Sequence, residues 1–256
     1  MIRFRILPQN QVPVQKKVSR PPVLRGLNVG INYTGKTYGL LGSIRDALNM
    51  HTFLTGKGYS CVAMTDNTSV KPTKANILKA LAQMLTLAQP GDKCFFTYSG
   101  HGTNTRDRSG DEVDGKDETI FTLDSQLLTD DEFRAVLNQS LKAGVELLAL
   151  FDSCYSGTVL DLRYTYSPNS VNTRVPETKG SVVMISGCRD SETSAENFIN
   201  GSWQGAMTSS FLHCVKTSTN AMALVGAMQT YLKTNGYQQR PLLSSGKPLG
   251  NQYRFV

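Results

Sequence analysis

The sequence lacks long apolar runs and paired cysteines. No stretch reaches the ~18 to 20 apolar residues that a membrane-spanning helix requires, and the N-terminus has no continuous apolar core of a secretion signal. Its five cysteines show no CxxC spacing, and its three histidines lie far from any cysteine pair, which argues against common zinc sites. We therefore expect a soluble protein of a reducing, cytoplasmic compartment, with free thiols. The basic, proline-containing residues 1–23 indicate an extended arm.

Charge is distributed unevenly along the chain. The net charge is +7, yet residues 107–132 hold ten of the twenty acidic side chains and two basic ones, so this segment is −8 and the remainder is +15. Such a run is most simply a solvated loop. The basic residues elsewhere are scattered, and no aromatic-basic motif accompanies them, so we expect no nucleic-acid partner.

Strand-like and helix-like segments alternate. Continuous apolar segments predict buried strands at 26–33, 60–66, 93–100, 145–152 and 181–188, and 253–256 is a further candidate. Helical spacing of apolar residues predicts helices at 42–59, 73–92, 129–144, 205–218 and 221–237. This alternation indicates an α/β fold with a mostly parallel central sheet and helices on both faces. The breaker-rich residues 162–180 predict a flexible internal loop.

Two predicted strands end in residues suited to covalent catalysis. "CFFTYSGHGT" carries His101 just past a strand, and "LLALFDSCYSG" carries Cys154 in the same position, 53 residues later. Active sites of parallel sheets lie beyond the carboxyl ends of the strands. An imidazole near a thiol stabilises the thiolate and transfers its proton. The backbone N–H groups of Gly102 and Cys154 are candidates for an oxyanion hole.

Three sequence blocks carry a family resemblance. "YSGHGT", "DSCYSG" followed by "TVLDL", and "ISGCRDSETSA" together resemble a type I metacaspase, from about residue 24 to the C-terminus. The resemblance implies one caspase-like peptidase domain over 24–256 and a monomer. It also implies that His101 and Cys154 form a catalytic dyad that acts through a thioester acyl-enzyme. The "QAC-x-G" motif of true caspases is absent.

The resemblance further implies cleavage after Arg or Lys. The matching substrate-binding positions are Asp46, Ser99 and Asp152, and Ser43 stands where the family commonly has cysteine. Paired carboxylates recognise a guanidinium through charge-assisted hydrogen bonds. A simpler interpretation of Asp152 is a cap or a partner for a nearby backbone N–H.

Calcium activation is also implied by the resemblance. The family's ligands match Asp117, Asp130, Asp131 and Asp161. Calcium prefers several oxygen ligands, although the acidic segment does not follow EF-hand spacing. The alternative is a solvated acidic loop.

An enzyme that cuts after basic residues has candidate self-cleavage points in the arm and in the 162–180 loop. These are Lys16, Lys17, Arg20, Arg174 and Lys179. The arm is also a candidate restraint across the active site. The competing function is a catalytically silent scaffold that binds basic peptide segments without cutting them.

Overall fold

The structure, a computed structural model, describes residues 20–106, 115–154, 156–166, 169–187, 196–199 and 202–256. Most of the predicted arm, with Lys16 and Lys17, lies outside the described residues, as does Cys188. Among the described helices, none is long and apolar enough to cross a membrane.

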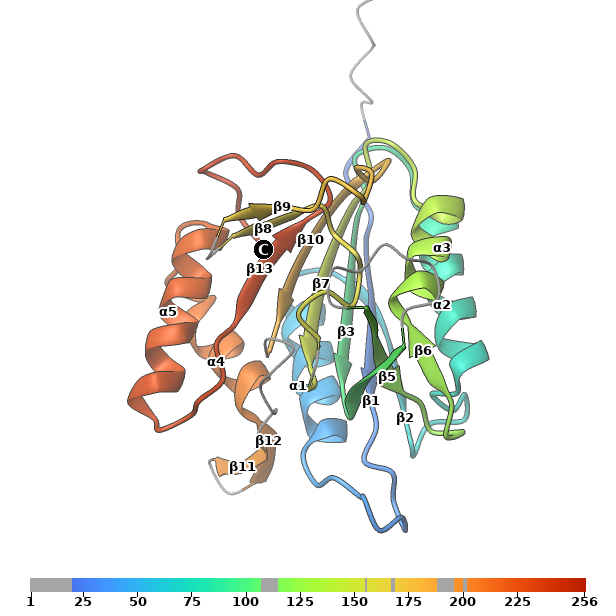
Figure 1. Cartoon of the computed structure of the whole chain (residues 1–256), viewed down its shortest axis with the longest axis vertical. Coiled ribbons are helices and arrows are strands. Elements are labelled where there is room, and N and C mark those ends of the chain that lie inside the picture. Colours follow the sequence, from blue (N-terminus) through green and yellow to red (C-terminus); the bar gives the residue numbers. More distant parts are fainter. Residues whose placement is uncertain (1–19, 107–114, 155, 167–168, 188–195, 200–201) are drawn as a thin grey trace, which may run out of the picture.

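An eight-stranded sheet forms the centre of the molecule (Figure 1), with the strand order β2-β1-β3-β7-β10-β13-β8-β9. The first five strands of this order are parallel, and the last three join antiparallel. Their bounds are β1 Leu24–Gly30, β2 Ser60–Thr65, β3 Lys93–Ser99, β7 Glu146–Asp152, β8 Tyr164–Tyr166, β9 Ser170–Val171, β10 Ser181–Ser186 and β13 Leu242–Ser245.

Helices cover both faces of this sheet (Figure 1). One face carries α1 (Ser43–Gly56), α4 (Ala206–Cys214) and α5 (Ala221–Thr234), and the other carries α2 (Lys74–Leu87) and α3 (Asp130–Ser140). The predicted fold class, a mostly parallel sheet with helices on both faces, is therefore confirmed.

Two hydrophobic cores explain why the central strands are apolar throughout. Phe96 and Tyr98 of β3 pack into the core beneath α2 and α3, whereas Phe95, which precedes Phe96, packs into the core beneath α1, α4 and α5. Because successive side chains of a strand point to opposite faces, a strand covered on both sides buries every residue. In β7, Phe151 and Leu150 divide between the two cores in the same way.

The acidic region contains more regular structure than its composition indicates. Strands β4 (Gly102–Arg106), β5 (Lys116–Phe121) and β6 (Leu127–Thr129) form a separate antiparallel sheet of three strands. Asp117 and Glu118 of β5 are buried. Pairing of β5 with its sequence neighbours β4 and β6 overrides the polar character of this segment.

Other segments also differ from the sequence pattern. Residues 162–180, which indicate a loop, contain β8 and β9 at the edge of the main sheet. Residues 253–256 form no strand, and β13 pairs with β10 instead, while Phe255 is buried in a core. A hairpin of β11 (Glu196–Ile199) and β12 (Ser202–Gly205) precedes α4.

Candidate active site

The structure places the histidine and cysteine segments side by side. Strands β3 and β7 are parallel neighbours, and Ser99 lies opposite Asp152 at their carboxyl ends. His101 and Cys154 each follow two residues later. A Cβ atom added to Gly102 would overlap the carbonyl oxygen of Cys154, so the two backbones lie in close contact. Both candidate catalytic residues therefore lie at the edge of the sheet that is formed by the carboxyl ends of the parallel strands.

The imidazole of His101 is held in a defined orientation. Its Nε2 lies 2.7 Å from the carbonyl oxygen of Tyr38. Because a carbonyl only accepts hydrogen bonds, Nε2 carries the proton, and Nδ1 of the neutral ring is the acceptor. The ring stacks on Tyr33 with centroids 4.9 Å apart. The backbone N–H of His101 donates to the Tyr33 hydroxyl at 3.0 Å, and Tyr98 donates to the His101 carbonyl oxygen at 2.7 Å.

Sequence reasoning missed the two tyrosines of "NYTGKTYG". Tyr33 has a φ of +51°, a region that non-glycine residues seldom adopt. Its hydroxyl also donates to the Phe121 carbonyl oxygen at 2.6 Å. Burial raises the pKa of Tyr33 far above its usual value, so the hydroxyl stays protonated. A positive-φ residue just after a strand is a signal that only the backbone reveals.

The other described thiols are poor nucleophiles. Burial raises the pKa of Cys94 to about 12, and burial also raises the pKa of Cys61 and of Cys214. A thiol attacks as its thiolate, so a raised pKa lowers reactivity at neutral pH. Cys154, by contrast, is half-buried at the sheet edge beside the histidine segment.

Two buried carboxylates meet below this edge. Asp46, in the first turn of α1, is 1% exposed, and Asp152, the last residue of β7, is 4% exposed. Ser99 donates its hydroxyl to Asp46 at 2.8 Å. The N–H of Gly205 donates to both oxygens of Asp46, at 3.1 and 2.9 Å. The structure thus brings together three of the four predicted substrate-binding residues, Asp46, Ser99 and Asp152.

Asp152 also caps a helix. The backbone N–H and the hydroxyl of Thr208 donate to its Oδ2 at 2.8 and 2.9 Å. Gly205, the N-cap of α4, supplies no side-chain cap. The carboxylate from β7 therefore takes the place of an N-cap side chain for a first-turn N–H that has no partner within the helix. As the simpler interpretation expected, Asp152 accepts a hydrogen bond from a helix N–H. That N–H belongs to Thr208, 56 residues away in the sequence.

Ser43 lies in the same helix turn as Asp46. It is the first residue of α1 and is 2% exposed. Its carbonyl oxygen lies where a side chain on Gly30 would sit. Ser43 therefore starts the helix that carries Asp46, three residues before that carboxylate.

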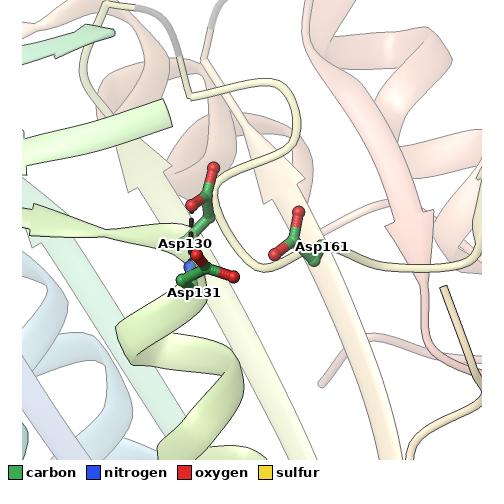
Figure 2. A group of neighbouring side chains, drawn as sticks. All are labelled: Asp130, Asp131 and Asp161. Carbon is green, nitrogen blue, oxygen red and sulfur yellow. Dashed lines mark hydrogen bonds between the residues drawn. The ribbon is translucent and has the colours of Figure 1, made fainter. Parts of the chain in front are cut away.

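The acidic residues gather in a second place, shown in Figure 2. Carboxylate oxygens of Asp130, Asp131 and Asp161 lie within 4.8 Å of one another. Asp130 and Asp131 begin α3, and Asp161 reaches them from the segment after β7 (Figure 2). Asp130 accepts hydrogen bonds from the N–H of Glu118 at 2.6 Å and of Asp131 at 2.7 Å. Within the described chain, the structure joins three of the four predicted metal ligands.

Asp117 is the predicted ligand outside this trio. It is buried in β5, next to Glu118, whose N–H contacts the cluster through Asp130. Asp161 has a φ of +46°, and its carbonyl oxygen accepts a 3.1 Å hydrogen bond from the buried guanidinium of Arg134. Arg134 also donates to the Pro176 carbonyl oxygen, so it links the cluster to residues 172–178.

The basic residues in the predicted cleavage segments differ in their contacts. Arg20 forms a 2.8 Å ion pair with buried Asp92, at the amino end of the parallel strands. Lys179 donates to the Asn138 carbonyl oxygen at 2.7 Å. Arg174 is exposed on a turn. Its backbone N–H donates to the side-chain oxygen of Asn172 at 3.1 Å.

Comparisons with known proteins agree with this geometry. Residues 24–163 match the family model of the metacaspase, peptidase C14 domain. Metacaspase-1 of Kluyveromyces lactis and of Saccharomyces cerevisiae are each 35% identical, over 91% of this chain and 68% of the relative. Metacaspase-1B of Aspergillus oryzae is 34% identical, over 91% of this chain and 70% of the relative.

A solved structure gives the same result for the fold. The crystal structure of a protein from Geobacter sulfurreducens superposes with a TM-score of 0.69 at 26% identity, covering 91% of this chain and 98% of that one. The family match spans both the histidine and the cysteine segments. The chain therefore belongs to the metacaspase family and is a cysteine peptidase of the C14 group.

Proposed function

We propose that the protein is a calcium-dependent endopeptidase that cleaves after Arg or Lys through His101 and Cys154. The observation that carries this proposal is the meeting of Asp46 and Asp152 at Gly205, directly below the edge that holds the histidine and the cysteine. A nucleophile and a buried acid pair at one edge suit the cutting of a bond beside a cationic side chain.

His101 acts as the general base. With the proton on Nε2 directed to the Tyr38 carbonyl, Nδ1 accepts the proton of the Cys154 thiol. The sulfur attacks the scissile carbonyl carbon, a C–S bond forms, and the C–N bond breaks as His101 returns the proton to the leaving amine. Water then hydrolyses the thioester, releases the carboxylate product and restores the thiol.

The oxyanion that forms during attack needs donors. The backbone N–H groups of Gly102 and Cys154 are our candidates, and the close contact between these two backbones supports the pairing. A side chain at Gly102 would displace the Cys154 carbonyl and disturb both positions.

Basic specificity rests on the acid pair. Two buried carboxylates at one point attract a guanidinium or an ammonium group and leave an acidic substrate side chain unpaired. Ser99 orients Asp46 through its 2.8 Å hydrogen bond, and Ser43 supports the same turn of α1.

Calcium is our proposed activator. Three carboxylates within 4.8 Å repel one another, and a divalent cation bound by their oxygens would offset that repulsion. The buried guanidinium of Arg134 nearby offsets only one of these negative charges. Asp130, Asp131 and Asp161 would hold the ion, and we include Asp117 as the fourth candidate. Binding would order the segment after Cys154, because that segment carries Asp161.

We also infer that the enzyme acts as a monomer on protein or peptide substrates and processes itself. Strands β8 and β9 pair beyond β13, so β13 is not an open edge strand to which a second copy could add its sheet. Arg174 is the favoured processing point, because it lies exposed on a turn.

A peptide-library digest with and without calcium tests the proposal, with Cys154→Ala as the inactive reference. We expect cuts after Arg and Lys only, only with calcium, and none by the variant. Cuts after Asp, or calcium-independent cuts, would contradict the corresponding part. Complete absence of turnover would favour the silent scaffold that binds basic segments.

A further inference from the structure

Gly205 lies where the two acids meet, and a side chain at this position would collide with them. Its φ of −69° and ψ of 135° suit any residue, so backbone freedom does not require glycine here. A Cβ atom at this position, however, would overlap the Oδ2 of Asp152 and lie 2.7 Å from the Oδ2 of Asp46. The absent side chain therefore makes room for both carboxylates.

Thr208 approaches the same point from the first turn of α4. It is 3% exposed, and both its N–H and its hydroxyl donate to Asp152. Gly205 donates its N–H to Asp46. The first turn of one helix thus supplies hydrogen-bond donors to both acids of the pair.

Donors of this kind matter because two neighbouring carboxylates oppose each other's ionisation. Hydrogen bonds to the charged form favour that form, and the positive end of a helix acts in the same direction. A cationic substrate side chain is attracted only to the extent that the acids are charged and correctly placed.

We propose that Gly205 and Thr208, at the start of α4, are specificity-determining positioning residues, which hold Asp46 and Asp152 as a charged pair facing the substrate's guanidinium or ammonium group. This inference rests on the proposed basic specificity of the site. The residues act through the acids, so they govern substrate selection and leave the chemistry at Cys154 unchanged.

Matched peptide substrates that carry either arginine or citrulline before the cut provide the test. Citrulline has nearly the shape of arginine without its charge, so the ratio of the two kcat/KM values reports on charge recognition. Thr208→Val removes the hydroxyl donor and keeps the backbone N–H. Thr208→Ser keeps both donors, and Ser209→Ala is a control on the same helix, at a half-buried residue.

We expect Thr208→Val to lower the arginine-to-citrulline ratio about tenfold, the effect of one hydrogen bond to a charged group. The loss should arise in KM for the arginine peptide, with kcat and the citrulline peptide unchanged. Thr208→Ser and Ser209→Ala should retain the wild-type ratio. Gly205→Ala should lower the ratio by about tenfold or more, because its methyl group displaces the acids.

Thermal unfolding identifies any variant that does not fold. If Gly205→Ala does not fold, the result for Thr208→Val tests the proposal, and the reverse holds as well. A wild-type enzyme that cleaves both peptides equally would refute the basic specificity itself. A wild-type preference that survives in folded Thr208→Val and Gly205→Ala would refute the role of α4 alone. Equal losses of kcat on both peptides would likewise assign these residues a merely structural role.

Discussion

Ser99 and Asp152 lie opposite each other as Cα partners on the neighbouring parallel strands β3 and β7. This register brings two chain segments together that are 53 residues apart in sequence. It aligns His101 with Cys154 above and two of the predicted substrate-binding residues below. The proposed nucleophile, its proposed base and the acid pair thus lie together at the carboxyl ends of these strands.

The first prediction concerns the nucleophile. Cys154→Ala should reduce hydrolysis of an arginine peptide to less than about one-thousandth, because no other described thiol lies beside His101. His101→Ala should lose at least about a hundredfold, the usual contribution of a general base. Fluorogenic peptide assays measure both. Cys61→Ala is the control, since burial raises the pKa of that thiol, and it should keep wild-type activity.

The second prediction concerns the acid pair. Asp152→Asn keeps an oxygen that accepts from Thr208, so the protein should fold, but it removes one charge. We expect kcat/KM for arginine peptides to fall about tenfold to a hundredfold, mainly through KM. Hydrolysis of the matched citrulline peptide should hardly change. A parallel drop for both peptides would show that Asp152 serves the fold and not substrate recognition.

The third prediction concerns the cluster in Figure 2. Asp131→Asn removes one carboxylate from the trio and should raise the half-activating calcium concentration about tenfold or more. Calcium should also raise the melting temperature of the wild type more than that of the variant.

Asp124→Asn is the matched control for this experiment. It removes the same charge from the same acidic segment, at an exposed position outside the trio. Chelator-treated protein whose activity and melting temperature ignore calcium would contradict the proposed site.

The fourth prediction concerns the buried Asp92 at the amino end of the strands. Burial alone raises its pKa, but hydrogen bonds from the N–H groups of Gln89 and Val23, and from Arg20 and Arg25, outweigh that effect and lower the pKa to about 2. Because the folded pKa lies below the unfolded value of 3.8, the charged form stabilises the fold above about pH 4. That contribution is lost as the pH falls through 2.

Urea unfolding of wild type and Asp92→Asn across this range measures the effect. The variant should be less stable by about 1–3 kcal/mol at neutral pH, with the difference shrinking as the pH falls from 4 toward 2. A difference that stays constant with pH would show that the carboxylate charge contributes nothing.

The sequence predicts the central strands and the five helices of the described residues because their signals are local. The helical spacing of Ile77, Leu81 and Met84 and the continuous apolar run before Asp152 arise from burial on one face or on both. The strands β5, β8 and β9 are not predictable in this way. They lack a continuous apolar run, and pairing makes them strands: β5 pairs with nearby β4, β9 pairs with nearby β8, and β8 pairs with distant β13.

By itself, the sequence determined the α/β architecture, the residue types of the site and the family. Only the tertiary structure decided that β3 and β7 are neighbours, that Tyr38 directs the imidazole, and that Gly205 and Thr208 meet the two acids. The physical reason is the separation along the chain of the residues that interact. Periodicity and capping depend on residues within a few positions, whereas strand order and helix docking depend on packing between surfaces that lie far apart along the chain.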